Sequence, residues 1–259
     1  MQLQKVLTQV SELVMLTLSY RIDLGWALKY GVKPDFADPE MSWDPHLDDT
    51  ILLESPVPPE SMSASIRDYV QTLTYKLRNV FADLQAFASV ANKLAVSSRK
   101  LRPDLFQEIM LSIQYRLMLL EYDLDCQPIE EALRLGLLAF QTSVFIQMKN
   151  IRVKYEDLIE RLRRAVSRIP ENVPLLVDLK LWILLMGAIA LFDPDHSWLE
   201  ENIRRTAKGR SWEEVHTLMR SIMWIDLVHD IPGGQVFDSA HAALGEVDLG
   251  LGRSRTHLL

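Results

Sequence analysis

Two short segments of the chain place acidic side chains close together, one of them beside a histidine, and their spacing could hold a metal ion. His46, Asp48 and Asp49 offer three metal-ligating groups within four residues. A metal site requires ligands held on a rigid frame, whereas these three lie in an expected proline-rich loop. Asp123 and Asp125 form a second acidic pair with the same weakness. A solvated acidic loop is the preferred interpretation, and we predict neither a metal site nor a cofactor.

The histidines do not form a spaced metal-binding motif, and the chain carries no recognisable catalytic signature. HExxH, GxSxG, the phosphate-binding loop and GxGxxG are all missing from the sequence. His216 lies in an expected helix and could face inward, but the sequence identifies no partner for it. A hydrogen-bonded structural histidine is therefore favoured over a general base at this position.

Composition limits the class of protein. The 259 residues are 48% apolar, which is enough for one large core, and the net charge is −7 with a pI near 5.4. An acidic chain does not attract nucleic acid through its overall field, so we expect no direct nucleic-acid binding. The single cysteine, Cys126, excludes an intramolecular disulfide framework, a zinc ribbon and a multi-cysteine iron–sulfur site.

The sequence also predicts a soluble intracellular protein. Its first residues lack the charged start and the apolar core of a secretory signal peptide. The longest apolar run covers residues 181–192, and these twelve residues are too few to span a bilayer. A buried core helix is the better interpretation of this run, and no membrane partner is expected.

Helical periodicity dominates, and no stretch alternates convincingly as a strand. Apolar residues recur at steps of three and four over residues 66–94, which predicts one long helix opened by a capping-box-like start at Ser65. Further helices are expected to begin at prolines, which suit a first helical turn: Pro103, Pro128 and Pro174. About eight helices with short connections predict a single all-α domain.

Other local signals set the ends of the predicted helices. A first helix over residues 3–30 is expected to stop at Gly31 in a left-handed cap. Ser211 and Glu214 have the spacing of a capping box. Gly233 and Gly234, which follow Pro232, are interpreted as a turn. The domain is therefore predicted to cover residues 1–234, with a C-terminal tail at 235–259 that is partly disordered.

One connection is much longer than the others. Residues 34–62 contain six prolines and eight acidic residues, without lysine or arginine. Loops of this length are functional or disordered, so the segment is either a partly ordered flap or a mobile excursion. Trp43 gives it a side chain with which to dock.

Aromatic residues and methionines in the most apolar helices suggest an adaptable ligand pocket, although plain core packing would explain them too. Polar residues such as Ser143 and Asp178 interrupt the apolar surface of these helices and need partners if they are buried. The residues assigned to the pocket are Phe140, Trp182, Met186, Met223 and Trp224.

A basic run that includes Arg161, Arg164 and Arg168 is interpreted as a solvated helix face.

The order of several weak motifs resembles the fungal-specific transcription factor domain, the regulatory region of zinc-cluster regulators. The motifs are SWEEV at 211–215 followed by MWID at 223–226, EEALRLGLLAF at 130–140, and a helix at 16–34 that ends in a glycine turn before a proline. The resemblance covers roughly residues 3–230. The zinc cluster of those regulators requires six cysteines, and this chain has one.

The resemblance implies an all-helical nuclear regulatory domain, dimeric and able to bind a hydrophobic small molecule in some members. It supplies no catalytic residues, because the family shares none. The chain is either an excised domain or a stand-alone version of it. The expected partners are a hydrophobic small molecule and a second copy or a transcription-factor partner.

Two functions follow from these features. The first is a regulatory module that does not bind DNA, and that senses a ligand or mediates association. The alternative is a cytoplasmic enzyme of fungal secondary metabolism that acts on a hydrophobic substrate, with the loop near Trp43 as its lid. Its candidate acid–base groups would be Tyr20, Asp23, Gln141 and His216. A third, structural option is a dimer interface without any pocket, which predicts an exposed apolar helix face.

Overall fold

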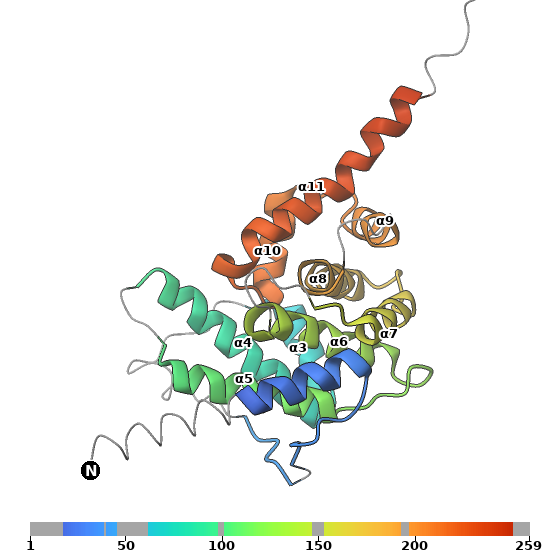
Figure 1. The fold of residues 1–259 in the computed structure, drawn as a ribbon. Helices are drawn as coiled ribbons and strands as arrows, with labels where there is room; N and C mark the ends of the chain where they lie inside the picture. The colour runs from blue at the N-terminus through green and yellow to red at the C-terminus, as the bar shows by residue number, and fades with distance from the viewer. Residues whose placement is uncertain are drawn as a thin grey trace, which may run out of the picture.

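The computed structural model describes residues 18–38, 40–45, 62–97, 101–146, 153–192 and 197–250, with side chains as far as residue 242 at the C-terminal end. Every regular element within those ranges is helical, as the all-α prediction requires (Figure 1). Residues 18–30 form the first described helix. The labelled elements are α3 (Ala64–Thr72), α4 (Tyr75–Ala95), α5 (Pro103–Leu119), α6 (Pro128–Gln141), the π-helical turn η1 (Thr142–Ile146), α7 (Glu156–Ser167), α8 (Pro174–Ala190), α9 (Ser197–Thr206), α10 (Trp212–Ile222) and α11 (Asp226–Gly250).

The described residues hold slightly more helices than the eight or so expected, and one reason is a break in the helix predicted over 66–94. Leu73 and Thr74 adopt extended backbone between α3 and α4. Leu73 is nevertheless buried, so the apolar periodicity runs through the break and hides it. The N-cap of α3 is Ser63 rather than Ser65, because the Ser63 side chain accepts the Ile66 N–H.

Two helices that are buried on nearly every face form the centre of the fold. In α6 every residue from 131 to 141 is buried, and in α8 every residue from 179 to 190. They pack together where Gly136 faces α8: a Cβ on Gly136 would lie 2.9 Å from the Ile183 side chain. The helices α4, α5, α7, α9, α10 and α11 surround this central pair.

The C-terminal helix α11 differs from the prediction of a turn at Gly233-Gly234. It runs through Pro232 without interruption and extends away from the body of the molecule (Figure 1). Gly233 lies against two indole rings, since an added Cβ would be 2.7 Å from Trp224 and 2.9 Å from Trp212. Here the glycine provides close packing rather than a turn, and Phe237 beyond it is buried.

Several local predictions are confirmed. Gly31, predicted to end its helix in a left-handed cap, has a φ of 64°, a conformation that glycine adopts without strain, and Gly209 has a φ of 79° in the same region. Ser211 and Glu214 form a reciprocal capping box at the start of α10. Each of the three prolines expected to open a helix lies in the first turn of α5, α6 or α8.

Trp43 docks on the helices. It packs against the core, its carbonyl accepts the Asn79 side-chain N–H at 2.8 Å, and Lys76 lies over its ring. Among the described residues no helix is both long and apolar enough to cross a bilayer.

The two adjacent glycines of α11 supply a matched test of this packing. We expect Gly233→Ala to lower the free energy of unfolding by about 1–3 kcal/mol, because the new methyl overlaps two indole rings. Gly234→Ala should be neutral or stabilising by up to about 1 kcal/mol, since its Cβ would meet Trp212 only at 3.6 Å or more and alanine favours helix. Urea unfolding of both variants measures the difference. Equal effects would show that α11 does not lie on the indoles.

Candidate functional site

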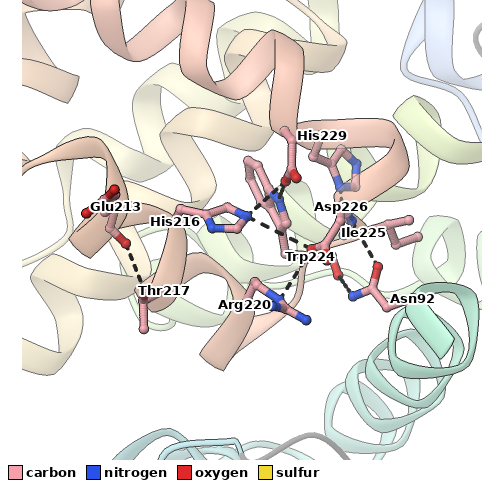
Figure 2. Close-up of polar contacts among 10 residues, drawn as sticks. Asn92, Glu213, His216, Thr217, Arg220, Trp224, Ile225, Asp226 and His229 are labelled. Atoms are coloured by element: carbon pink, nitrogen blue, oxygen red, sulfur yellow. Dashed lines mark hydrogen bonds and ion pairs between the residues drawn. The ribbon is translucent and has the colours of Figure 1, made fainter. Parts of the chain in front are cut away.

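A cluster of polar and titratable residues lies where α10 turns into α11, and we call this region the α10–α11 corner. It comprises His216 and Arg220 of α10, Trp224 in the connection, and Asp226, His229 and Asp230 in the first turns of α11. Figure 2 shows His216, Arg220 and Asp226 converging between the two helices. The connection between the two helices is short: α10 ends at Ile222, its C-cap residue Met223 is extended, and α11 begins at Asp226.

The backbone of the corner is held by neighbouring helices. Asn92 of α4 donates its side-chain N–H to the Trp224 carbonyl at 2.9 Å, and its amide oxygen accepts the Asp226 N–H at 2.9 Å. From α8, the Trp182 indole donates to the Met223 carbonyl at 2.6 Å. Two buried hydrogen bonds and one partly buried hydrogen bond therefore fix the turn that places the polar side chains.

One carboxylate oxygen links two rings of the corner. Asp230 Oδ1 accepts the Trp224 indole N–H at 2.7 Å and the His216 Nε2–H at 2.9 Å. The bond to a carboxylate assigns the proton of neutral His216 to Nε2. The second carboxylate, of Asp226, lies 3.3 Å from Arg220 Nε and 4.0 Å from His216 Nε2.

The fully buried His229 is tied to α6 and η1. Its Nδ1 accepts the Ile225 N–H at 3.0 Å, so its Nε2 carries the proton and donates to Ser143 Oγ at 2.9 Å. The Ser143 hydroxyl in turn donates to the Phe140 carbonyl at 2.6 Å. A base that activates serine must accept the hydroxyl proton, and this imidazole does the reverse. The pair is therefore a structural hydrogen bond rather than a nucleophile with its base.

Burial strongly favours the neutral form of His229. Desolvation lowers its pKa to about 3, and the nearby negative charge of Asp230 offsets only part of this effect. The Phe140 and Trp224 rings lie 5.1 and 5.0 Å from the imidazole, centroid to centroid. Solvent does not reach the imidazole in this position, so the charged form would not be solvated, which explains why the pKa is lowered.

The four acid–base candidates from the sequence occupy three separate places. Asp23 accepts the Tyr115 hydroxyl at 2.8 Å and the backbone N–H groups of residues 35 and 36, so it ties helix 18–30 to α5 and to its own loop. Tyr20 packs edge-on against Tyr115. Gln141 is buried and donates to the Met110 carbonyl, and His216 lies in the α10–α11 corner.

Burial, with the Asp23 carboxylate as the next cause, raises the pKa of the Tyr115 hydroxyl. The phenol that contacts Asp23 therefore stays protonated and serves as a hydrogen-bond donor, which fits a structural role for the Asp23 cluster.

The residues assigned to a ligand pocket all lie in the core. Phe140, Trp182, Met186, Met223 and Trp224 are each at most 1% exposed. Phe140 and Trp182 pack against each other with ring centroids 6.3 Å apart. The three cavities described next are lined by other residues.

An apolar cavity of about 200 Å³ lies where α8, α9 and α11 meet, and we call it the α8–α9–α11 cavity. Its rim carries a hydrogen bond from Ser239 Oγ to Glu200 Oε1 at 2.8 Å. It is lined by Ala188, Ile189, Phe192, Leu199, Glu200, Ile203, Pro232, Gln235, Val236 and Ser239. Five of these residues are Ala, Ile, Leu or Val, so the lining is largely hydrocarbon.

Two smaller or more open hollows, of about 150 and 340 Å³, share Gly31, Asp157 and Arg161. Charged groups that line them are already paired. Arg161 contacts the Glu131 carboxylate at 2.9 Å, and Arg134 donates two hydrogen bonds of 2.7 Å to the same carboxylate. These hollows hold structural ion pairs.

The remaining charged motifs behave as local structure. Arg164 and Arg168 pair with Glu160 and Asp125, so the predicted basic face meets acidic partners. Asp123 accepts the backbone N–H groups of residues 125 and 126 in a turn, and these hydrogen bonds lower the pKa of its carboxyl. The segment 46–49 lies outside the described residues.

Sequence reasoning missed the acidic and histidine residues of α11. Asp226, His229 and Asp230 stand at positions i, i+3 and i+4, a spacing that gathers them on adjoining faces of one helix. The signal was present in the sequence. It was hidden because Pro232 and the two glycines after it predict that no helix continues there.

Comparisons of this chain with protein-family models, with curated proteins and with solved structures return no match.

The buried histidine predicts how stability depends on pH. His229 titrates near 6.5 in the unfolded chain but only near 3 in the folded protein, so between these values the unfolded state binds more protons. The free energy of unfolding should fall by up to about 1.4 kcal/mol for each pH unit below about 6.5. In His229→Asn, which can still accept the Ile225 N–H but cannot be protonated, this slope should disappear.

Urea unfolding of the two proteins between about pH 7 and about pH 5 measures the slope. His241→Asn, a half-buried histidine of the same helix, is the control and should keep the wild-type slope. A parallel pH dependence of wild type and His229→Asn would show that His229 is not held neutral.

Proposed function

We propose that this protein is a non-catalytic regulatory module that binds an apolar small molecule in the α8–α9–α11 cavity. The observation that carries the proposal is the cavity itself, a hydrocarbon-lined space with a polar rim. The resemblance of the sequence to the fungal-specific transcription factor domain supports the regulatory role and a nuclear location. The all-helical fold agrees with that resemblance.

The cavity suits a small apolar compound. An engineered apolar cavity of roughly 150 Å³ is enough to bind benzene, and this one measures about 200 Å³. Glu200 and Ser239 at the rim offer an acceptor and a hydroxyl, which would orient one polar group of the ligand. The ligand class is therefore a compact hydrophobic molecule with a single polar substituent.

Two of the helices that line the cavity also form or hold the α10–α11 corner. Pro232, Val236 and Ser239 line it from α11, the helix whose first turns form the α10–α11 corner. Ala188 lines it from α8, which holds the same corner through Trp182. A ligand that prefers one spacing of α8 and α11 would shift the population toward that spacing.

The enzyme alternative gains less support from the geometry. Among the described residues the four candidate acid–base groups do not meet at one cavity, and the pairing of Ser143 with His229 has the wrong hydrogen-bond polarity for catalysis. The function proposed is accordingly binding without turnover.

The proposal is tested by filling the cavity. Protein purified from a fungal host should carry a bound non-protein mass in native mass spectrometry. Val236→Phe places a ring in the cavity and should appear bare, with at least a tenfold loss of occupancy. Val228→Phe, the same change on the same helix away from the lining, should retain the ligand.

Other results would contradict the proposal in identifiable ways. A wild-type protein without any bound mass removes its support, and a mass retained equally by Val236→Phe places the ligand elsewhere. Conversion of the released compound by the protein would favour the enzyme.

A second function, self-association, is favoured by one specific surface. Helix 18–30 exposes a row of apolar side chains at intervals of four residues, with Ile22 and Trp26 each 61% exposed. Such a row lies along one helix face and is the pattern by which helices pair. The full row is Leu18, Ile22, Trp26 and Tyr30. We propose that this face pairs with the same face of a second copy.

Removing the apolar character of the row tests self-association. We expect Ile22→Glu and Trp26→Glu to weaken a dimer at least tenfold, because each places a charge in an apolar contact. Ile231→Glu, at an exposed position on α11, is the control and should not change the mass. Sedimentation equilibrium measures the dissociation constants. A wild-type monomer at high concentration would overturn this second proposal.

A further inference from the structure

We propose that the α10–α11 corner binds a zinc-class divalent transition metal, with His216, Asp226 and Asp230 as its three protein ligands. The ligand atoms of these residues all lie within 4.8 Å of one another. This site is distinct from the apolar cavity and does not depend on the function proposed for it.

The separations in the corner are close to those of a metal centre. Ligands about 2.0–2.1 Å from tetrahedral zinc are about 3.3–3.4 Å from each other. His216 Nε2 lies 2.9 Å from Asp230 Oδ1 and 4.0 Å from Asp226 Oδ1, so the two distances bracket that value. Small rotations of the side chains bring both carboxylates to coordination distance when the ion replaces the proton on Nε2.

The frame that carries the ligands is rigid, unlike the acidic loop considered from the sequence. Asp226 and Asp230 are four residues apart and share a face of α11, and His216 reaches them from α10. Asn92 fixes the backbone at Asp226 through its amide oxygen. The Trp224 indole donates to Asp230, the kind of outer hydrogen bond that orients a ligating carboxylate.

The donor set indicates the class of metal. An imidazole nitrogen suits zinc, copper, iron, cobalt and nickel, whereas magnesium prefers oxygen ligands alone. Three protein ligands leave a fourth position for water, as in open zinc sites. The three side chains are 26%, 34% and 43% exposed, so an ion can enter from solvent and that water can be accommodated.

Arg220 would compete with a metal ion for the Asp226 carboxylate. Its Nε lies 3.3 Å from Asp226 Oδ1, where the guanidinium charge partly neutralises the carboxylate. The Arg220 side chain is 39% exposed and can turn toward solvent when a cation arrives. Removing this positive charge should strengthen metal binding, whereas the loss of a purely structural ion pair would bring no such gain.

Titration of the untagged full-length chain with Zn²⁺ or Co²⁺ alone tests the site, with calorimetry for Zn²⁺ and absorption spectroscopy for Co²⁺. We expect one ion per chain. Asp230→Asn and His216→Ala should weaken binding at least tenfold, since even outer-sphere changes cost tenfold or more. Arg220→Ala should bind about tenfold more tightly. Asp238→Asn and His241→Ala, the same kinds of change further along α11, should bind as the wild type does.

The outcomes separate the proposal from a nonspecific acidic surface. Binding that survives unchanged in Asp230→Asn, or that weakens in Arg220→Ala, would overturn it. Equal competition by Mg²⁺ would overturn the class of metal. Asp230→Asn preserves the shape of the side chain, and circular dichroism verifies that each variant is folded before its titration is interpreted.

Discussion

The close packing of α6 on α8 at Gly136 is the constraint on which the rest of the fold depends. Both helices are buried on nearly every face, over residues 131–141 of α6 and 179–190 of α8, so neither lies at the surface. A side chain at Gly136 would meet Ile183, and the missing Cβ lets the two helices come together. The remaining helices then have a buried axis to cover: α4, α5 and α7 pack on α6, and α9, α10 and α11 pack on α8.

Buried charges fix how the outer helices sit on this axis. Arg116 of α5 contacts Asp83 of α4 at 2.6 Å, and both side chains are almost completely buried. Arg134 of α6 binds Glu131 and also donates to the Leu117 carbonyl of α5. A buried ion pair adds little net stability over an apolar pair, but a mispaired charge is strongly destabilising. These contacts therefore discourage other registers of α4, α5 and α6.

The parts of the fold that local chemistry controls could be predicted, and those set by distant partners could not. The apolar run of α8, the capping box at Ser211 and the left-handed Gly31 follow from neighbouring residues. The helix through Pro232 does not, because it depends on Gly233 resting against Trp212 and Trp224. His216 could be placed on a helix, but periodicity identifies a face and never its partner. The hydrogen bond between His216 and Asp230 could be identified only from the structure, which places α11 beside α10.

The packing of α11 on the two indoles gives this one helix two roles. Its first turns supply the acidic groups of the corner, and its next turns line the apolar cavity with Pro232 and Val236. The Trp224 indole donates to Asp230 in the corner and packs under Gly233, which directly follows the cavity residue Pro232 in α11. A molecule in the cavity and a cation in the corner would each favour particular positions of the same helix. Coupling of this kind is reciprocal, so either ligand would change the affinity for the other by the same factor.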